Sequence, residues 1–446
     1  MMTVIRKKQL IRFAAAAAGA CLLGGCASGN RTAGPESNYA DPNDYSGSDS
    51  ERINAAVRDA GKYGGTVRIG RRKADGVSDR DCWLLDSAIL IPGNTTLIIS
   101  NCRIKLSDRA RDNWIRSANC AVGKPDVDWI SHVHIIGEGN AVLEGADDPR
   151  STGDSSKNLT KDVFDQMKIV NGSVIRNTYG TDAGKADENQ KGDWRNIGIL
   201  LARVKDFSIR NLTLRNAHSW SVSLEYCRRG QIRELNFEAD EHPVINGREV
   251  TMLNRDGLDL RNGCRDITIE NITGYSGDDL IALTAIGSSP RPAGRLRSMH
   301  FCGGDPDLRE QDVFNIVIRN IRGYSAGGYM IVRFLNQKGV RMHRIQLDGV
   351  LDTSPAGHRC MAAVKIGDAN YGGPAKRGET SDFLIGNIQT QAKHAFIFGS
   401  PLSDSLIFNV RYFRPDKKYG FIGWHKGKQE LPGVDFSACK TIGPAE

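Results

Sequence analysis

Three features that would have assigned this 446-residue sequence to a class at once are missing from it. None of its ten cysteines forms a Cys-x-x-Cys pair, so a cysteine-ligated metal site is not expected. There is no basic run with interleaved aromatic residues, so nucleic acid is not an expected partner. The apolar run at residues 13–25 has 13 residues, whereas a membrane-spanning helix needs about 20. The sequence therefore argues against these three classes.

What the sequence does contain suits a folded domain with many turns. Apolar residues make up 39% of the chain and aromatic residues 7%, which argues against disorder. Its 49 glycines exceed average usage and favour an architecture rich in tight turns. Four of the eight net positive charges lie at the N-terminus, at Arg6, Lys7, Lys8 and Arg12, which leaves the remainder at about +4 (8 − 4). That mild excess is compatible with an acidic polysaccharide as partner.

The first 50 residues are predicted to direct export rather than to fold. The positive charges precede the apolar run, which ends in Leu23-Gly24-Gly25-Cys26 and resembles the bacterial lipobox. The resemblance implies a lipoprotein signal peptide at residues 1–25, removed to leave a diacylated Cys26. Residues 26–50 are polar and rich in Gly, Pro and Ser, as expected of a tether. We expect an exported chain that meets the membrane through its lipid anchor only, on the periplasmic or cell-surface face; by resemblance, Ala27 points to the outer membrane.

Export permits disulfide bonds, and eight cysteines remain after Cys21 and Cys26. Most of them are expected to be buried as small apolar residues, with one or two disulfide bridges among them.

One short helix is expected, followed by strands. Ser50 is predicted to cap a helix over residues 50–63, with Ile53, Ala56, Val57 and Ala60 at helical spacing. After it, a short strand pattern recurs eight times. The copies lie at residues 94–106, 132–145, 206–214, 266–274, 315–323, 341–349, 382–390 and 404–412.

The repeats predict a solenoid. The shortest spacings between copies are about 23 to 26 residues, and a unit made only of strands can bury its apolar face only against the next copy. Four copies share an asparagine, at Asn211, Asn271, Asn320 and Asn387, expected to adopt the left-handed conformation at a bend and to stack between coils. We predict an all-β, right-handed parallel β-helix over residues 51–446 with an N-terminal capping helix. Two β-sandwiches or a propeller are the alternatives, and neither needs this repeat.

A cluster of aspartates follows from that repeat. The stretch SGDDLIALT holds Asp278 and Asp279, and NRDGLDLRN holds Asp256 and Asp259. The interval from Asp256 to the adjacent pair is close to the shortest spacing of the repeat, so the pair lies one coil after Asp256. Successive parallel strands lie about 4.8 Å apart, so three carboxylates are expected to converge on one patch.

Converging carboxylates cannot all ionise freely, so the pKa of at least one should rise. A protonated carboxyl beside ionised ones suits general acid and base catalysis, as in glycosidic bond hydrolysis. A calcium site and aspartates that only make turns are the alternatives.

The two motifs resemble a known family. N-R-D-G-L-D-L and S-G-D-D-L-I-A-L are similar to the N-T-D-G-F-D and G/Q-D-D-C motifs of the polygalacturonases, glycoside hydrolase family 28, in the pectin-lyase-like β-helix superfamily. The resemblance implies a divergent inverting hydrolase without a cofactor. In it, Asp278 would be the general acid, and Asp256 and Asp279 would position and activate water.

The sequence departs from the family pattern at its basic residues. Where the family has G-H-G, aligning residues 274–283 with 323–332 leaves Tyr329 in place of the histidine. The R-I-K motif is matched only by Lys365, with Gly367 at the second basic position. Because these residues bind a uronate carboxylate in polygalacturonases, galacturonate is in question. Arg333 or Arg261 could supply a substitute charge.

Six residues are predicted to bind substrate. Trp220 could stack on a sugar ring, with His218 near it. The other five are Asn254, Asp259, Tyr329, Arg333 and Lys365. Polar insertions at 146–194 and 286–312 are expected to wall a cleft.

The sequence thus predicts an inverting glycoside hydrolase that acts on a complex polysaccharide or oligosaccharide, which could contain uronate. Two alternatives stay open: a calcium-dependent polysaccharide lyase on the same fold, and a non-catalytic glycan-binding or adhesion β-helix. The oligomeric state is not predicted.

Overall fold

The computed structural model describes residues 38–443 except 75–79, 122–126, 151, 153–167, 171–172, 176–193, 251, 287–306 and 369–372. The predicted signal peptide and Cys26 lie outside the described residues, as does most of both insertions. Within the described part, no helix is long and apolar enough to cross a membrane.

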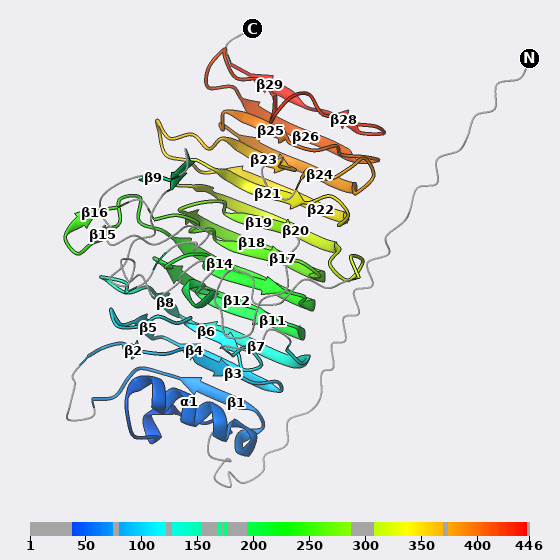
Figure 1. Ribbon diagram of the computed structural model, residues 1–446. Coiled ribbons are helices and arrows are strands. Elements are labelled where there is room, and N and C mark those ends of the chain that lie inside the picture. Colours follow the sequence, from blue (N-terminus) through cyan, green and yellow to red (C-terminus); the bar gives the residue numbers. More distant parts are fainter. Residues whose placement is uncertain are drawn as a thin grey trace, which may run out of the picture. The chain divides into compact units, whose positions relative to one another are not determined.

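The chain begins with a small helical cap at one end of the strands (Figure 1). It consists of the 3₁₀ turn η1 (Pro42–Asp44), helix α1 (Asp49–Asp59) and the 3₁₀ turn η2 (Ala60–Tyr63). All four apolar residues predicted for the inner face of α1 are buried. They cover the first coil, as predicted.

The predicted N-cap of the helix was wrong by two residues. Ser48 caps α1: its side chain accepts a hydrogen bond from the Glu51 N–H, and the Glu51 carboxylate accepts one from the Ser48 N–H. Ser50 is buried instead, and its hydroxyl accepts from the N–H groups of Asp86 and Ser87. The folded part also starts earlier than residue 51, because Ala40 already pairs with Val67.

Two parallel sheets form most of the remaining described part of the molecule. The larger follows the order β1 (Thr66–Ile69), β4 (Thr95–Ser100), β7 (Ile130–Glu138), β12 (Val204–Arg215), β14 (Arg228–Glu238), β18 (Arg265–Ser276), β20 (Val313–Ser325), β22 (Met342–Asp352), β24 (Thr380–Thr390), β26 (Leu406–Phe413) and β28 (Asp435–Ser437). Joined to it are β2 (Trp83–Leu85), β5 (Arg103–Leu106), β8 (Val142–Glu144) and β29 (Lys440–Ile442).

The smaller sheet contains the strands that position the site. Its order is β3 (Ile89–Ile91), β6 (Ile115–Ser117), β11 (Ile199–Ala202), β13 (Val222–Glu225), β17 (Leu258–Arg261), β19 (Ile281–Ala285), β21 (Met330–Asn336), β23 (Ala362–Ile366), β25 (His394–Phe398) and β27 (Ile422–Trp424). Outside both sheets lie η3 (Trp194–Asn196) and the pairs β9 (Lys168–Val170) with β10 (Ser173–Ile175) and β15 (Val244–Ile245) with β16 (Arg248–Glu249).

From β11 to β27, strands of the two sheets alternate along the chain, so each of these coils contributes one strand to each sheet, whereas the earlier coils contribute two strands to the larger one. Ile199 pairs with Val222 on the next coil, an interval equal to the shortest spacing of the sequence repeat. Val222 in turn pairs with Leu258 on the following coil. This is the predicted right-handed parallel β-helix, and the predicted coil length is confirmed.

The recurring asparagines bend the long strands. Asn211, at φ 57°, divides β12 into a part that pairs with β7 and a part that pairs with β8. Asn271, Asn320 and Asn387 have φ values of 55° to 57°, and the Asn320 amide donates to the Asn271 amide at 2.6 Å. The bends and the contact between coils agree with the prediction.

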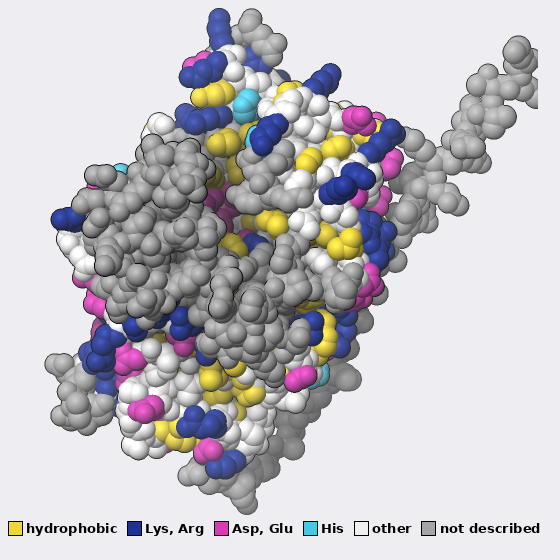
Figure 2. Space-filling model, viewed as in Figure 1, with side chains coloured by type: hydrophobic (Ala, Val, Ile, Leu, Met, Phe, Trp, Pro, Cys, Tyr) yellow, Lys and Arg dark blue, Asp and Glu magenta, His cyan; other side chains and the backbone are white. Residues whose placement is uncertain are grey.

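The hydrophobic core lies between the two parallel sheets. Inward residues of successive strands stack in columns, such as Leu260, Leu283, Phe334 and Ile366, all buried. Among the described cysteines, six are buried and none forms a disulfide; Cys302 lies outside the described residues. On the face shown in Figure 2, basic and acidic side chains of the described residues are interspersed.

Candidate active site

The predicted aspartates lie where the chain enters two neighbouring strands of the smaller sheet. Asp256 precedes β17, and Asp278 and Asp279 fill the turn between β18 and β19. Leu258 pairs with Ile281, and the same register sets Asp279 beside Asp256. The Asp279 N–H donates to Asp256 Oδ1 at 2.8 Å, which fixes this neighbourhood.

The three carboxylates converge as predicted. One side-chain oxygen from each of Asp256, Asp278 and Asp279 lies within 4.8 Å of the others. Asp256 and Asp279 are buried, whereas Asp278 is partly exposed. Asp278 is therefore the member that solvent or a ligand can reach most directly. We refer to these residues as the acid trio.

Local backbone contacts hold the turn that carries Asp278. The N–H groups of Gly277 and Asp278 both donate to the Arg255 carbonyl, at 2.9 and 3.1 Å. The Ser276 hydroxyl donates to the Asp278 carbonyl at 2.7 Å. A Cβ at position 277 would lie 2.7 Å from Arg255 Nε, so the turn is tight enough to require glycine there. The SGDD sequence thus builds a turn that projects two carboxylates.

Burial and mutual repulsion raise the pKa values of Asp256 and Asp278. Burial raises the pKa of Asp278 well above its usual value, and the charge of Asp279 raises it further. The pKa of Asp256 is raised well above its usual value by burial and then by Asp259, Asp278 and Asp279. These carboxyls therefore hold a proton where an exposed aspartate would be ionised.

Asp279 has a different environment from its two neighbours. Its Oδ1 accepts from the Met330 N–H at 3.0 Å, and its Oδ2 accepts from Arg333 Nη1 at 3.1 Å. Of the acid trio, it is the member that faces a cation directly. It is thus the carboxylate best placed to carry the negative charge.

Asp259 lies near the acid trio, on β17 of the smaller sheet, but its side chain is fully buried. Burial raises its pKa to about 8, partly offset by Arg261, whose Nη1 is 4.0 Å from Asp259 Oδ1. Asp259 is 1% exposed. It adds to the charge of the cluster rather than presenting a carboxylate at its surface.

Trp220 was predicted to stack on a sugar, and the structure places it in a packed position. Its side chain is 5% exposed, and the Arg261 guanidinium covers its ring at 4.3 Å from the centroid. It also packs in a cluster with Trp194 and Tyr226. Its ring face is therefore not available to a sugar in this conformation. The neighbouring His218 is also buried, and its Nε2 accepts from the Ala146 N–H at 2.9 Å.

Tyr329, Arg333 and Lys365 lie on the two strands after the acid trio. Tyr329 immediately precedes β21 and is half-buried, and its N–H donates to the Ser325 hydroxyl at 3.0 Å. Arg333 on β21 pairs in register with Lys365 on β23. The structure therefore brings these residues toward the acid trio. Asn254, at φ 53°, is close by in sequence, and its carbonyl accepts from the Ser219 hydroxyl.

One charged residue of this region, Asp368, was not predicted from the sequence. Asp368 Oδ2 accepts from Lys365 Nζ at 2.5 Å and from Arg333 Nη2 at 3.0 Å. The signal was present in VKIGD, where an acid stands three residues after Lys365. Only the register shows that Arg333 reaches the same acid.

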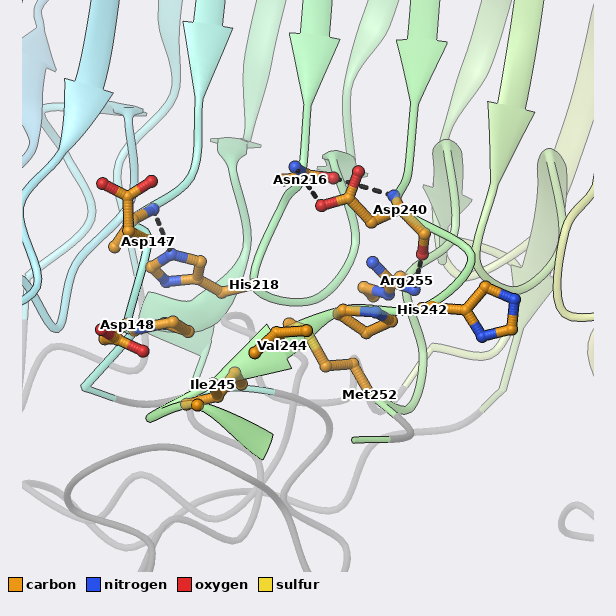
Figure 3. Close-up of a pocket in the computed structure, with 14 residues that line it drawn as sticks. Asp147, Asp148, Asn216, His218, Asp240, His242, Val244, Ile245, Met252 and Arg255 are labelled. Carbon is orange, nitrogen blue, oxygen red and sulfur yellow. Dashed lines mark hydrogen bonds between the residues drawn. The ribbon is translucent and has the colours of Figure 1, made fainter. Parts of the chain in front are cut away.

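A pocket of about 410 Å³ adjoins the site through Arg255, the residue before Asp256 (Figure 3). Asn216, His218, Asp240 and Met252 also line it. Arg255 Nη2 donates to the Asp240 carbonyl at 2.7 Å, and burial lowers the Arg255 pKa to about 10. This pocket offers room for a ligand that extends beyond the acids.

The acid trio could also hold a cation. Three carboxylate oxygens within 4.8 Å are a donor set that a hard divalent ion such as calcium accepts. Asp279 already receives Arg333 and a backbone N–H, however, which leaves it fewer free lone pairs for an ion. The geometry therefore fits acid–base chemistry better than a calcium cage.

Comparison with known proteins supports the same chemistry. The family model for Glycosyl hydrolases family 28 matches residues 156–290, a range that contains the acid trio. No curated protein matches the sequence.

Several solved structures are similar to this chain at low identity. The endo-xylogalacturonan hydrolase from Aspergillus tubingensis is 13% identical, with a TM-score of 0.46 over 93% of this chain and 92% of its own. An exopolygalacturonase from Thermotoga maritima is 11% identical, with a TM-score of 0.45 over 87% and 91%. The Streptococcus pneumoniae surface protein and adhesin PfbA is 11% identical, with a TM-score of 0.39 over 90% and 98%.

The family match and the acid trio within it agree with the predicted resemblance to the glycosyl hydrolases of family 28 over residues 156–290.

Proposed function

We propose that this chain is an inverting glycoside hydrolase of a complex polysaccharide, with Asp278 as general acid and with Asp256 and Asp279 as the groups that hold and activate water. The single observation that carries the proposal is the convergence of three carboxylates in the segment that matches family 28. A general acid must reach the leaving oxygen, and Asp278 is the partly exposed member of the trio.

The protonation states expected of the trio suit this division of roles. Burial and the Asp279 charge raise the pKa of Asp278, so it retains the proton that the leaving oxygen needs. Asp279 faces Arg333, which favours its negative charge and its action on water. Asp256 completes the water site from the preceding coil, through the hydrogen bond it accepts from Asp279.

Inversion rests on the family resemblance. Carboxyl groups are commonly about 6.5–9.5 Å apart in inverting enzymes and about 5–5.5 Å apart in retaining ones. The closest oxygens of the trio lie within 4.8 Å, which taken alone would favour retention. The anomer of freshly formed product distinguishes the two outcomes.

The experiment is NMR of the fresh product from a panel of pectic, algal and host glycans incubated with the full chain. Hydrolysis with an inverted anomer is expected. A retained anomer contradicts the water-activating role given to Asp256 and Asp279. The Asp278→Asn variant serves as the blank, since it lacks the acid and is expected to keep the fold.

Two other functions remain as outcomes of the same assay. A calcium-dependent polysaccharide lyase on this fold would lose activity in EDTA and release products that absorb near the unsaturated-uronate band. A non-catalytic glycan-binding or adhesion β-helix would bind glycans and hydrolyse none. The hydrolase proposal expects activity that survives EDTA without that absorbance.

We also propose that the chain is exported and anchored by lipid at Cys26, on the outer membrane. The lipobox resemblance of residues 23–26 motivates this proposal. Labelled palmitate should enter the wild type and not Cys26→Ser, and the variant should be released in soluble form. Incorporation into Cys26→Ser would contradict it.

A further inference from the structure

A second charged cluster lies beside the acid trio and is built around one buried carboxylate. Asp368 is 3% exposed on its side chain and lies 2.5 Å from Lys365 Nζ, 3.0 Å from Arg333 Nη2 and 3.4 Å from His425 Nδ1. Lys365 and Arg333 are themselves 8% and 13% exposed. We call these four residues the Asp368 cluster.

The fold places this cluster in line with the site. Asp259, Ala282, Arg333 and Lys365 occupy one row across four successive strands, β17, β19, β21 and β23. Gly367, at φ 76°, turns the chain directly after β23 and returns Asp368 over Lys365. A Cβ on Gly367 would lie 2.0 Å from Ser400 Oγ, so the turn is fixed by packing.

Both cations of the row are already neutralised from within the protein. Arg333 contacts Asp279 with one nitrogen and Asp368 with another, and Lys365 contacts Asp368. Burial and the Lys365 charge lower the pKa of His425, so it adds no fixed positive charge near neutral pH. Arg261, at the end of β17, faces Asp259 and the Trp220 ring.

Asp279 and Asp368 thus already face the two cations that a substrate carboxylate would need, Arg333 and Lys365. Asp256, Asp259 and Asp278 have raised pKa values and offer a substrate carboxylate no positive charge. A substrate carboxylate beside Arg333 or Lys365 would have to share these cations with Asp368 or displace it. Sharing brings like charges together, and displacement leaves a buried carboxylate without its partners, which is strongly unfavourable. An uncharged hydroxyl could instead share hydrogen bonds with these groups without displacing any.

We propose that Asp368 is a specificity-determining residue: as an internal counter-ion it occupies the place of a substrate carboxylate, so the sugar unit bound beside the acid trio is uncharged. This inference rests on the proposed function for the location of the substrate. It narrows the substrate from a complex polysaccharide to one with a neutral sugar at the cleaved bond.

Binding tests this inference without requiring turnover. Asp278→Asn, as the full chain, is titrated by calorimetry with pairs of short oligosaccharides that differ only in the uronate carboxylate: galactose and galacturonate, glucose and glucuronate, mannose and mannuronate. At least one neutral member should bind at least 10-fold more tightly than its uronate partner. Tighter binding of the uronate member in every pair that binds, or no binding of any neutral probe, overturns the inference.

A second variant assigns the preference to Asp368. Asp278→Asn combined with Asp368→Asn should gain at least 10-fold in uronate affinity relative to the neutral partner. Asp312→Asn is the matched control in the same background, because Asp312 is also a buried aspartate paired with an arginine, Arg341, outside the cluster. An unchanged uronate-to-neutral ratio in the Asp368 variant contradicts the assignment.

The two proposals fail in different ways. A wild type that hydrolyses no glycan while Asp278→Asn still prefers neutral sugars refutes the hydrolase and leaves the inference standing. Hydrolysis of uronate units in preference to neutral ones refutes the inference and leaves the hydrolase standing. If Asp368→Asn does not fold, the preference measured in Asp278→Asn alone still decides the inference.

Discussion

The helical cap and the middle coils both bury aspartates, and they treat them in opposite ways. In the cap, Asp49 is 2% exposed on its side chain and accepts from Arg72 Nε at 2.9 Å, from Arg80 at 3.3 Å and from the Leu84 N–H at 2.8 Å. In the middle coils, Asp256 and Asp278 face each other and Asp279, and neither forms an ion pair with a cation among the described residues.

The difference distinguishes an aspartate that stabilises the fold from aspartates that are available for catalysis. A buried carboxylate that is fully paired ties elements together, as Asp49 ties α1 to Arg72 and to β2. Buried carboxylates that face one another store an unfavourable interaction, which a folded chain tolerates where function requires it. Asp368 lies between these cases, since it is paired like Asp49 but adjoins the acid trio.

The largest expected effect is on catalysis. Replacing Asp256, Asp278 or Asp279 singly by Asn should lower turnover by about 10²–10⁴-fold, because each removes an acid or base from the reaction. The free energy of unfolding at pH 7 should be unchanged or higher for Asp278→Asn, since asparagine is uncharged and does not have to take up a proton when the chain folds. Initial rates and thermal unfolding measure both.

Asp266→Asn is the control, because Asp266 is an exposed aspartate at the start of β18 whose φ of 58° asparagine also accepts. Near wild-type rates in two of the three site variants would refute the mechanism.

The second effect falls on stability and belongs to the cap. Asp49→Asn should lower the free energy of unfolding by about 3–5 kcal/mol, because it leaves Arg72, 1% exposed, without its carboxylate. Turnover per folded molecule should stay at the wild-type value. Chemical denaturation with a parallel activity assay measures this.

Arg80→Gln is the matched control for the cap. Arg80 is 43% exposed, so its ion pair with Asp49 should contribute about 0–1 kcal/mol. A loss in Asp49→Asn no larger than in Arg80→Gln would remove the distinction between the two regions.

The third effect is a pH dependence that arises in the site. The pKa of Asp259 is raised to about 8 in the folded chain from 3.8, and those of Asp256 and Asp278 are raised in the same direction. A raised carboxyl pKa means that the folded state binds the extra proton between these values. The stability from this proton is fully present below about pH 4 and is lost as the pH rises towards 8.

Asp259→Asn should therefore flatten the fall in unfolding free energy between pH 4 and pH 8. Denaturant titrations across that range compare it with Asp266→Asn, which should follow the wild type. A wild type that gains stability from pH 5 to pH 8, together with an unchanged slope in Asp259→Asn, would contradict the sign.

The sequence was sufficient to predict the fold and the acid trio, because both depend on one repeat. The coil length that pairs Ile199 with Val222 also pairs Leu258 with Ile281, and it sets Asp256 against Asp279. The Ser48-x-x-Glu51 capping box was equally visible in the sequence. Ser50 was predicted as the N-cap instead, because it lies closer to the apolar residues at helical spacing.

Contacts that depend on variable coil lengths could not be predicted. Gly274 pairs with Gly323, and a constant interval would then pair Ile281 with Met330, but Ile281 pairs with Val332 instead. Two extra residues between β20 and β21 thus bring Tyr329, rather than Gly327, to the level of Asp278. The convergence of Arg333 on Asp368 and the burial of Trp220 under Arg261 depend on the same side-chain packing between coils.

The smallest effect is expected at the bends, where the sequence repeat reflects backbone conformation and not charge. Asn320 is exposed, has φ 55° and donates to Asn271. Asn320→Ala should lower the unfolding free energy by about 1–2 kcal/mol, since a non-glycine residue without a polar side chain is disfavoured in the left-handed region. Asn320→Gly loses the same amide contact without that conformational penalty, so it should be the more stable variant. If alanine is tolerated as well as glycine, the asparagines are held by their contacts between coils and not by the bend. Turnover should be unaffected in both variants, because the bend lies on the larger sheet and the acid trio on the smaller.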